Sequence, residues 1–344
     1  MILHFMHHAV PAIARVAISP PVVALTSRRK AMASVFMLHR FEPAAGGHEL
    51  TTVRNLLGWV RRNRFEVLDL ETLLRRLAGD GPTPRRAIAF TIDDGYRCQA
   101  QIGAPIFAEF DAPVTTFLTT GFLDGETWLW WDRIEYVLRR TDAKHLLLPA
   151  TGRPREFPIG PAGERHRTIE AVTEYCKKLP DRERHKAIAQ IIEQAGITIP
   201  SAPPPEYAPM TWEEARRCEA GGMRFGPHTV THPILARTDD DQARYEIEVS
   251  WQRLKAELSN PVPVFGYPNG RSGDFGPREI AILRRLGFLG AVSAEAGYAS
   301  DPEPPEGDRW FRVPRFSFSR RHSENLRYAS GLERLWRKVR RLGR

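Results

Sequence analysis

Short apolar runs alternate with segments of helical spacing along most of the chain, and this alternation restricts the fold strongly. The runs have the length of strands, and the segments between them repeat apolar residues every three to four positions. This pattern predicts parallel β/α units, in which functional side chains gather where the strands end. The predicted elements are strands at 33–41, 86–96, 112–120, 223–227, 262–267 and 288–293, a short strand and a helix within 65–79, and helices at 50–63, 99–110, 211–222, 239–259 and 277–286.

The alternation breaks between residues 124 and 207. This segment contains WLWWDRIEYVLRR, charged stretches of helical spacing and the proline-rich IPSAPPPEYAP. We therefore expect an α/β domain over residues 31–320 with a mostly helical insertion at about 124–207. An N-terminal extension (1–30) precedes the domain and a basic C-terminal helix (321–344) follows it. A chain of 344 residues is long enough for one large α/β domain of this kind.

Two motifs carry the residues from which a catalytic site could be built. The run IAFTIDDGY (88–96) ends in adjacent aspartates, Asp93 and Asp94, and the loop HTVTH contains His228 and His232. The two histidines could be polar residues of a turn. Together with one aspartate they could also form a three-ligand metal site with open positions for water and substrate. One aspartate would then bind the metal, while its neighbour accepts a proton.

The motifs TIDDG, HTVTHP and FGYPNG, in this order, resemble the polysaccharide deacetylase family, the NodB-homology carbohydrate esterases, over about residues 33–320. The resemblance implies a distorted (β/α)-barrel of about seven units. It implies hydrolysis of an N-acetyl, or less often an O-acetyl, group on a sugar. By the same resemblance, Asp93 is the catalytic base, while Asp94, His228 and His232 hold one divalent metal ion. Zinc is the first expectation, with cobalt or nickel as alternatives.

The third motif departs from the pattern of many family members, which carry an arginine and a tyrosine where this chain has Gly266 and Asn269. One branch of the family has a small residue followed by Tyr-Pro at this place. The resemblance assigns the oxyanion donor to a backbone N–H, which Asn269 retains. Another residue must then hold Asp93. Our candidate is Arg315 in FRVPRFSF, with a surface arginine as the alternative interpretation.

The general acid is the second departure. Many family members place this histidine near the end of the domain, where this chain has His322 in a charged stretch. In one branch, which includes deacetylases of biofilm poly-N-acetylglucosamine, the acid is a histidine on the first strand. The stretch VFMLHRF resembles that strand, so we expect His39 to be the acid. The alternative is a core histidine bonded to the backbone.

Aromatic residues near the ends of the predicted strands are candidates for sugar contacts. In the segment WLWW, Trp130 and Trp131 could stack on a sugar ring or could anchor the insertion to the core. We also place Tyr96 and Tyr267, from the first and third motifs, among the substrate contacts. Asp132 could bind a sugar hydroxyl, although capping of the next helix is the preferred interpretation.

Charge and composition bear on partners and location. The formal net charge is +9, and SRRK (27–30) and the segment 332–344 are conspicuously basic. No zinc-finger spacing or aromatic RNA-binding motif accompanies them, so we expect no nucleic-acid partner. The basic end of the chain suits either a solvated helix or peripheral contact with an anionic membrane. No apolar run of spanning length occurs, residues 1–26 fit a signal peptide poorly, and the three cysteines show no paired spacing.

We therefore expect a cytoplasmic enzyme that acts on an acetylated amino-sugar glycan or on its lipid-linked or nucleotide-linked precursor. Two histidines and an aspartate also occur in non-haem iron oxygenases. Those enzymes usually carry a His-x-Asp pair on a β-sandwich, so this interpretation is the weaker one. The motifs would also suit an O-acetyl sugar esterase or a non-catalytic glycan-binding relative. A binding protein would be expected to lack a metal ligand or the base, and this chain lacks neither.

Overall fold

The computed structural model describes residues 32–41, 50–82, 84–150, 153–161, 163–300, 307–334 and 336–337. The N-terminal extension and residues 338–344 lie outside the described residues. The central strands are all parallel and pair in the order β10-β1-β3-β4-β7, with β8 and β9 as a separate pair. Their bounds are β1 (Met32–Leu38), β3 (Arg86–Asp94), β4 (Val114–Leu118), β7 (Arg224–Pro227), β8 (Val264–Gly266), β9 (Gly290–Val292) and β10 (Phe316–Ser317); the short β2 (Glu66–Val67) pairs with the start of β3.

Hydrogen bonds outside the regular ladders join the two sets of strands into a ring. The N–H of Val262, just before β8, donates to the carbonyl of Phe225 in β7 at 2.7 Å. On the other side, the N–H of Val313 donates to Ala291 of β9, and Ser293 donates back to Val313. The ring therefore contains β1, β3, β4, β7, β8, β9 and β10. The predicted distorted (β/α)-barrel of about seven units is confirmed.

Helices surround this ring, as the spacing of apolar residues predicts. Thr211 caps its helix with Glu214 as the reciprocal partner, and the two residues form a capping box. The helices of the barrel are α3 (Leu50–Arg62), α4 (Leu70–Ala78), the π-helix η2 (Gln99–Gly103), α5 (Ala104–Glu109), α6 (Thr120–Leu123), α10 (Trp212–Ala220), α11 (Asp240–Glu257), α12 (Pro277–Arg285) and α13 (His322–Ala329), with 3-10 turns η3 (Pro205–Tyr207), η4 (Leu235–Arg237) and η5 (Arg309–Phe311).

Alternate side chains of β3 enter two different hydrophobic clusters. Ala87 and Ala89 pack on the inner face of the sheet with residues of α4, β8 and β9. Ile88 and Phe90 pack on the outer face, under α3 and α5. Because side chains alternate along a strand, the next inner positions are residues 91 and 93. Strand β3 therefore directs Asp93 toward the inside of the barrel.

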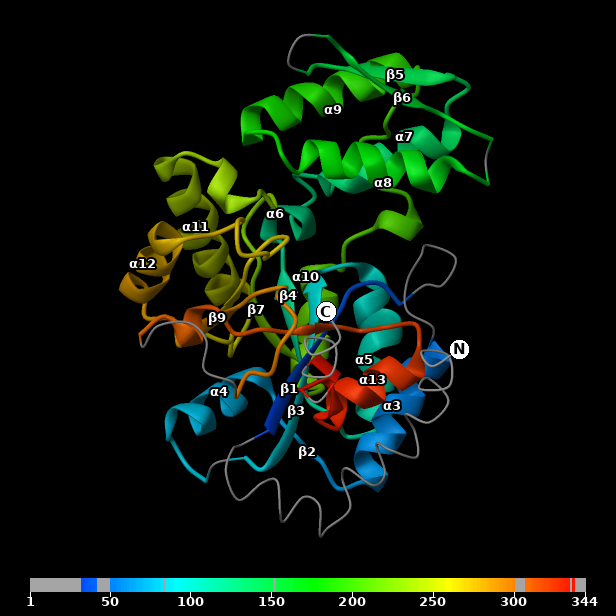
Figure 1. Ribbon diagram of the computed structural model, residues 1–344. Helices are drawn as coiled ribbons and strands as arrows, with labels where there is room; N and C mark the ends of the chain where they lie inside the picture. The colour runs from blue at the N-terminus through cyan, green and yellow to red at the C-terminus, as the bar shows by residue number, and fades with distance from the viewer. Residues whose placement is uncertain are drawn as a thin grey trace.

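The insertion forms a layer above the carboxyl ends of the strands, at the top of Figure 1. It contains α7 (Trp130–Arg140), β5 (His145–Leu148), β6 (Arg155–Pro158), α8 (Arg165–Cys176) and α9 (Asp181–Ala195) around a hydrophobic cluster of its own. Helices make up most of the regular structure of the insertion, as expected, and the antiparallel hairpin β5–β6 is an addition that was not predicted. Its strands have only four residues each, and β5 reads HLLL, a leucine-rich run that does not distinguish a short strand from a helix.

The predicted C-terminal helix begins as part of the barrel packing. Helix α13 lies against α3, and its Leu326 and Ala329 join the main core. It ends at Ala329, and Gly331 adopts a positive φ of 83°. The predicted helix over 321–344 is therefore not continuous in its described part.

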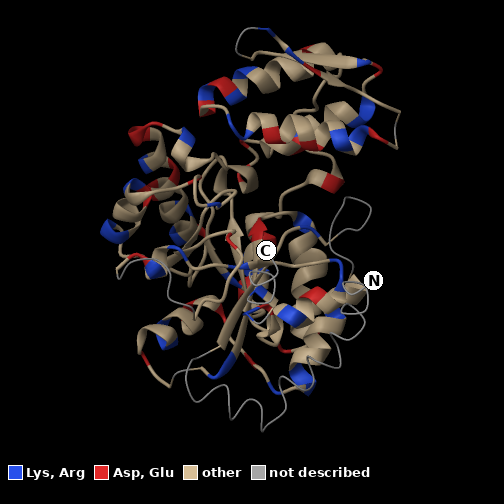
Figure 2. Ribbon diagram, in the orientation of Figure 1, with Lys and Arg blue, Asp and Glu red and all other residues tan. Residues whose placement is uncertain are grey.

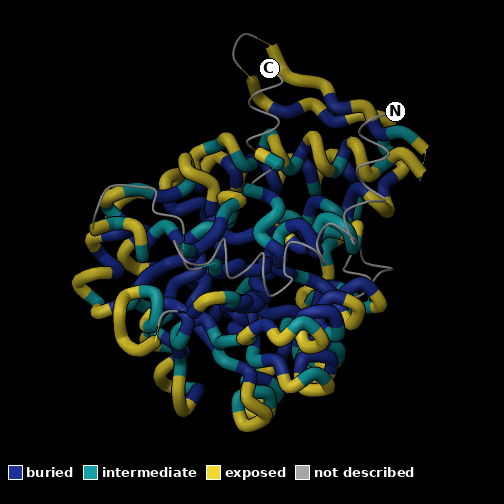
Figure 3. The backbone as a smooth tube through the Cα atoms, turned by 60° about the horizontal axis from the view of Figure 1, so that its bottom comes forward, coloured by how far each residue is buried: buried dark blue, intermediate teal, exposed yellow. Residues whose placement is uncertain are grey.

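Burial and charge follow the expected distribution. Buried residues concentrate in the middle of the molecule (Figure 3), and basic and acidic residues are interspersed on the outer helices (Figure 2). Cys98 and Cys176 are buried and Cys218 is partly exposed, and all three are free thiols. Within the described parts of the chain, no helix has both the length and the apolarity needed to cross a membrane.

Candidate active site

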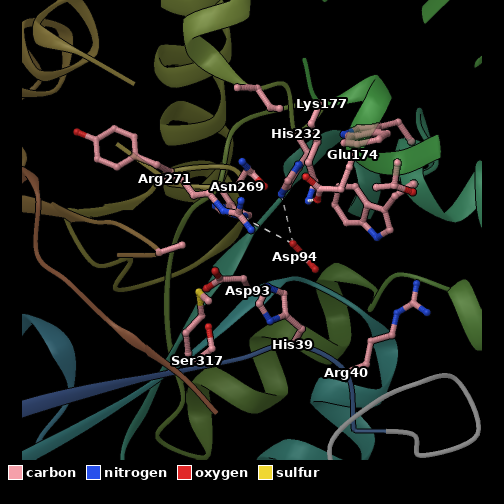
Figure 4. A pocket seen from close by; sticks show the side chains of 18 of the residues that line it. His39, Arg40, Asp93, Asp94, Glu174, Lys177, His232, Asn269, Arg271 and Ser317 are labelled. Carbon is pink, nitrogen blue, oxygen red and sulfur yellow. Dashed lines mark hydrogen bonds and ion pairs between the residues drawn. The ribbon is translucent and has the colours of Figure 1, made fainter. Parts of the chain in front are cut away.

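A cavity of about 790 Å³ lies between the carboxyl ends of the strands and the insertion (Figure 4). Ten of the eleven predicted site residues line it, and Arg315 lies behind Asp93. Helix α8 adds a wall that includes Glu174, and Lys177 directly follows this helix. Arg271 follows the third motif on the opposite side. The lining residues predicted from the sequence are His39, Asp93, Asp94, Tyr96, Trp130, Trp131, His228, His232, Tyr267 and Asn269.

Arg315 holds Asp93 in a buried, two-pronged ion pair. Its Nη1 and Nη2 lie 2.7 Å and 2.8 Å from the two carboxylate oxygens of Asp93. The guanidinium is itself fixed by Thr91 Oγ1 and by the carbonyl of Ser293. Burial alone would raise the pKa of Asp93, but Arg315 and then His228 outweigh it and hold that pKa below its usual range. Arg315 is fully buried, so the alternative of a surface arginine is wrong.

Asp94 faces the two histidines because its backbone departs from the strand. Strict alternation would send its side chain to the outer face, but its φ of 91° turns it toward the cavity. Its Oδ1 lies 3.7 Å from His228 Nε2 and 3.4 Å from His232 Nε2. Gly95 then continues the turn with a φ of 98°, and a Cβ there would meet Leu123 at 2.7 Å. Gly95 is therefore required for two reasons: its backbone has a positive φ, and a side chain at this position would clash with Leu123.

His228 is oriented by the residue that departs from the family pattern. Its Nδ1–H donates to the carbonyl of Gly266 at 2.7 Å, which leaves Nε2 facing Asp94. A Cβ at Gly266 would meet the ring of Phe117 at 2.8 Å and His228 Nδ1 at 2.9 Å. There is no room for an arginine side chain at position 266, and Arg315 binds Asp93 instead. Burial, followed by His232, lowers the pKa of His228 to about 4, so its imidazole is neutral at neutral pH.

The segment 228–232, the histidine loop, is fixed by side chains that accept its backbone N–H groups. Thr229 Oγ1 accepts from the N–H of His232 at 3.0 Å. Glu246, a buried residue of α11, accepts from the N–H groups of Val230 and Thr231 at 2.7 Å and 2.9 Å. A lone glutamate in a charged helix looks solvent-exposed in the sequence, so no signal there identifies Glu246.

Backbone strain is concentrated at this site. Among the described residues, six besides glycine have a positive φ, and four of these belong to the cavity wall or the histidine loop. Such conformations cost on the order of 1–3 kcal/mol each and persist where the surroundings hold them. The four are Asp94, Thr229, His232 and Asn269.

The group formed by Asp94, His228 and His232 fits a divalent metal ion. One ligand atom from each residue lies within 4.8 Å of the others, and all three residues are buried. The lowered pKa of His228 keeps a nitrogen lone pair available, and its other nitrogen has the carbonyl partner typical of metal-binding histidines. Two imidazoles and a carboxylate suit a divalent transition metal.

Gln99 joins the strand ends that carry His39 and Asp93. Its Nε2 donates to the carbonyls of His39 and Asp93, at 3.0 Å and 2.5 Å, and its Oε1 accepts from the N–H of Gly95. It begins the π-helix η2, a rare element that often marks functional sites. The prediction missed Gln99, although a glutamine one turn after DDG was a usable signal. His322 does not line the cavity.

Asn269 offers a backbone donor to the cavity. Its side-chain amide is bonded to Asp274, and its φ is 60°. No other described residue accepts a hydrogen bond from its backbone N–H. This N–H can therefore bind a developing negative charge.

The predicted aromatic contacts differ in exposure. Trp131 is partly exposed, whereas Trp130 belongs to the core of the insertion. Tyr96 and Tyr267 line the cavity but are only 2% and 1% exposed. Tyr267 stacks on Phe275, with ring centroids 3.7 Å apart. Of the four, Trp131 has the most surface available for a sugar.

Asp132 is not the helix cap that the sequence suggested. Leu129 occupies the N-cap position of α7 and makes no side-chain cap bond. The Asp132 carboxylate instead accepts hydrogen bonds from Tyr96 Oη, at 2.8 Å, and from Arg40. Arg40 is a further residue of the cavity wall that the prediction missed, because an arginine after a strand reads as exposed.

Comparison with known proteins supports the resemblance stated from the sequence. Residues 160–290 match the family model described as polysaccharide deacetylase. This range contains the histidine loop and the third motif but not the DDG strand. A search of curated proteins finds no match. The resemblance to the deacetylase family is confirmed by this match and by the fold.

Three solved structures share the fold at low sequence identity. The deacetylase PplD of Streptococcus pyogenes, in complex with acetate, aligns with a TM-score of 0.56 at 17% identity, over 86% of this chain and 97% of its own. IcaB from Ammonifex degensii aligns at 0.55 and 15%, over 87% and 97%. The deacetylase domain of BpsB from Bordetella bronchiseptica aligns at 0.50 and 14%, over 83% and 94%.

Proposed function

We propose that this chain, a relative of the polysaccharide deacetylases, is a metal-dependent hydrolase that removes an N-acetyl group from an amino-sugar unit of a glycan. The observation that carries the proposal is the pairing of two arrangements in one cavity. Asp94, His228 and His232 form a buried ligand set, and Asp93 lies beside it as an ionised carboxylate held by Arg315.

The chain's own residues divide the reaction among them. Asp93 accepts the proton of a water as its oxygen bonds to the acetyl carbon. The N–H of Asn269 donates to the oxyanion that develops on the carbonyl oxygen. His39, protonated, donates a proton to the sugar nitrogen as the C–N bond breaks. The products are acetate and a free amine.

Asp94, His228 and His232 would hold the metal. When bound, a divalent ion supplies Lewis-acid polarisation and lowers the pKa of water. Arg315 keeps Asp93 ionised and fixes its orientation. Gln99 holds the backbone of Asp93 and His39 in register, so that proton acceptor and proton donor face the same cavity.

A deacetylation assay with zinc, cobalt or nickel restored after chelation tests this function. The substrates are N-acetylated oligosaccharides, nucleotide-linked and lipid-linked N-acetyl sugars, and O-acetyl sugars as the alternative class. Asp93→Asn should lose activity by more than about 100-fold and keep the metal, whereas Asp94→Ala should lose both. Wild-type turnover by Asp93→Asn, or none on any substrate by the metal-loaded wild type, would overturn the proposal.

We further propose that the substrate is a precursor glycan in the cytoplasm and that the basic C-terminal segment contacts anionic membrane. The support is the cluster of Lys and Arg in residues 332–344, which suits the anionic cytoplasmic face of a membrane. Sedimentation with anionic vesicles at low and high salt tests the contact. Binding that is insensitive to salt, or absent, contradicts it.

A further inference from the structure

Trp131 contacts a proposed metal ligand directly, and the chemistry above gives it no role there. Its indole lies against the imidazole of His232 at a ring-centroid distance of 4.5 Å and an interplanar angle of 70°. Trp131 belongs to α7, the first helix of the insertion, whereas His232 follows β7 of the barrel. The contact therefore joins the insertion to the ligand set.

The two histidines of the ligand set are held in different ways. His228 donates its Nδ1–H to the carbonyl of Gly266, the usual arrangement for a metal-binding histidine. His232 Nδ1 is buried and has no hydrogen-bond partner in the described parts of the chain. Its ring is instead held between aromatic neighbours, with Trp131 at 4.5 Å and His228 at 4.7 Å. The orientation of the His232 ring must therefore be fixed by packing, whereas that of His228 is fixed by a hydrogen bond.

Trp131 is fixed in turn by three residues, which we name the Arg40–Tyr96–Asp132 cluster. Trp131 Nε1–H donates to Tyr96 Oη at 3.1 Å, and Arg40 Nη2 donates to the same oxygen at 2.9 Å. Tyr96 Oη donates to Asp132 Oδ2 at 2.8 Å. One donated and two accepted bonds use the full capacity of a phenol hydroxyl. Because Tyr96 and Asp132 are 2% and 1% exposed, solvent does not compete for these bonds.

We propose that Trp131 is a positioning residue for the metal ligand His232, and that the Arg40–Tyr96–Asp132 cluster holds Trp131 in place. Arg40 follows β1, Tyr96 follows β3, and Trp131 and Asp132 begin α7, so the cluster ties two strand ends of the barrel to the insertion. The docked insertion thus completes the metal site. This inference rests on the proposed function, because it requires a metal at Asp94, His228 and His232.

Metal binding to the whole chain tests the inference without reference to activity. Metal-free wild type and variants are titrated with Co²⁺, and affinity and the visible spectrum are recorded. Trp131→Ala should bind Co²⁺ at least about tenfold more weakly and with an altered spectrum, since supporting residues of metal sites typically contribute about 10–100-fold. Trp131→Phe keeps an aromatic ring against His232 and should restore most of the affinity.

Trp128→Ala is the matched control, because Trp128 lies in the same segment, is 9% exposed and packs on Tyr136 and Tyr207 rather than on His232. It should bind Co²⁺ as wild type does. An equal weakening in Trp128→Ala and Trp131→Ala would overturn the proposal. Unchanged Co²⁺ affinity and an unchanged spectrum in Trp131→Ala would also overturn the proposal. Should Trp131→Ala not fold, Trp131→Leu and Tyr96→Phe carry the test, with weaker binding expected in both and wild-type binding contradicting it.

Tryptophan fluorescence provides a second readout. Co²⁺ or Ni²⁺ bound beside Trp131 should quench its emission, and Trp131→Phe should lose that part of the quenching while it still binds the metal. Equal quenching in Trp131→Phe and wild type contradicts the placement. Failure of the proposed function gives a different result: wild type and His228→Ala would then titrate alike, with no specific site in either.

Discussion

Asp93 and Asp94 are neighbours in the chain but occupy different environments. Asp93 keeps the alternation of β3 and meets Arg315 inside the barrel. Asp94 leaves the alternation through a positive φ and meets the two histidines. One backbone torsion therefore separates a carboxylate suited to proton transfer from one suited to metal binding.

Replacing Arg315 should shift the pH dependence of activity. In Arg315→Gln the charge that lowers the pKa of Asp93 is gone and burial, which raises it, remains. The pKa of Asp93 then rises, the base becomes protonated at higher pH, and the acidic limb of the kcat/KM profile moves toward neutral pH. Lost orientation should also reduce kcat by about 100-fold. The measurement is a pH–rate profile.

Arg312→Gln is the control for this change, because Arg312 stands in the same motif but contacts the ring of Phe275 instead of Asp93. Its profile should match that of wild type. An unshifted acidic limb in Arg315→Gln would show that Arg315 does not set the protonation of the base.

Replacing His39 should impair turnover and spare the metal. Loss of a general acid typically costs about 10²–10⁴-fold in rate. His39 lines the cavity but is not among the three proposed ligands, so metal affinity should stay at the wild-type value. Kinetics and metal titration of His39→Ala are compared with those of His322→Ala. Full activity in His39→Ala together with an inactive His322→Ala would reverse the assignment.

At the scale of secondary-structure elements, the histidine loop depends on α11. Glu246 from the middle of that helix accepts two backbone N–H groups of the loop and the hydroxyl of Thr231. Two buried N–H groups would otherwise lack partners, so the helix contributes to the site although it supplies no reacting group.

Glu246→Ala should therefore destabilise the fold and weaken metal binding together. Each buried donor left without a partner costs about 1–3 kcal/mol, so a loss of about 3 kcal/mol in the free energy of unfolding is expected. Chemical denaturation and Co²⁺ titration measure the two effects. Glu248→Ala, on the same helix in a partly exposed pair with Arg285, should lose less than about 1 kcal/mol. Equal losses in both variants would refute the role of Glu246.

At the scale of the molecule, the cavity is shared between two packed units. The barrel supplies the strand ends, and the insertion, with its own core, supplies α7 and α8 as the upper wall (Figure 4). The insertion also contacts α11 through a hydrogen bond from Gln242 to Asp181 at 2.9 Å. The substrate must therefore bind between the barrel and the insertion, each of which has its own hydrophobic core.

Metal binding should stabilise the whole molecule. A ligand at about 100 times its Kd adds about 2.7 kcal/mol to the free energy of unfolding. For a chain of 344 residues, whose unfolding entropy is about 2.1 cal/mol/K per residue, this corresponds to a rise in Tm of roughly 4 °C. Thermal unfolding after chelation, and again after zinc is restored, measures the change. His228→Ala should show no rise; an equal rise in that variant would place the stabilising metal elsewhere.

Much of the fold and site could be predicted, and most of the failures share a cause. The strands, most helices and the four residues of the two main motifs follow from periodicity and from a resemblance carried by short motifs. The sequence did not predict the hairpin β5–β6 or the contributions of Gln99, Glu246 and Arg40. It also led to the wrong prediction that Asp132 caps a helix. The hairpin joins two nearby strands, and it was missed because the run HLLL does not distinguish a short strand from a helix. The other features depend on partners distant in the chain, as with Asp132 and Arg40 or Glu246 and Val230.

The sequence by itself determined which chemical groups stand at the strand ends, because side-chain alternation and loop position are local properties of the chain. Only the tertiary structure decided how those groups are held. Arg315 is 222 residues away from Asp93, and it reaches that carboxylate because the ring closes β10 onto β1. Gly266 is small because Phe117 and His228 fill its space. Such contacts arise from packing across the barrel, which no local pattern encodes.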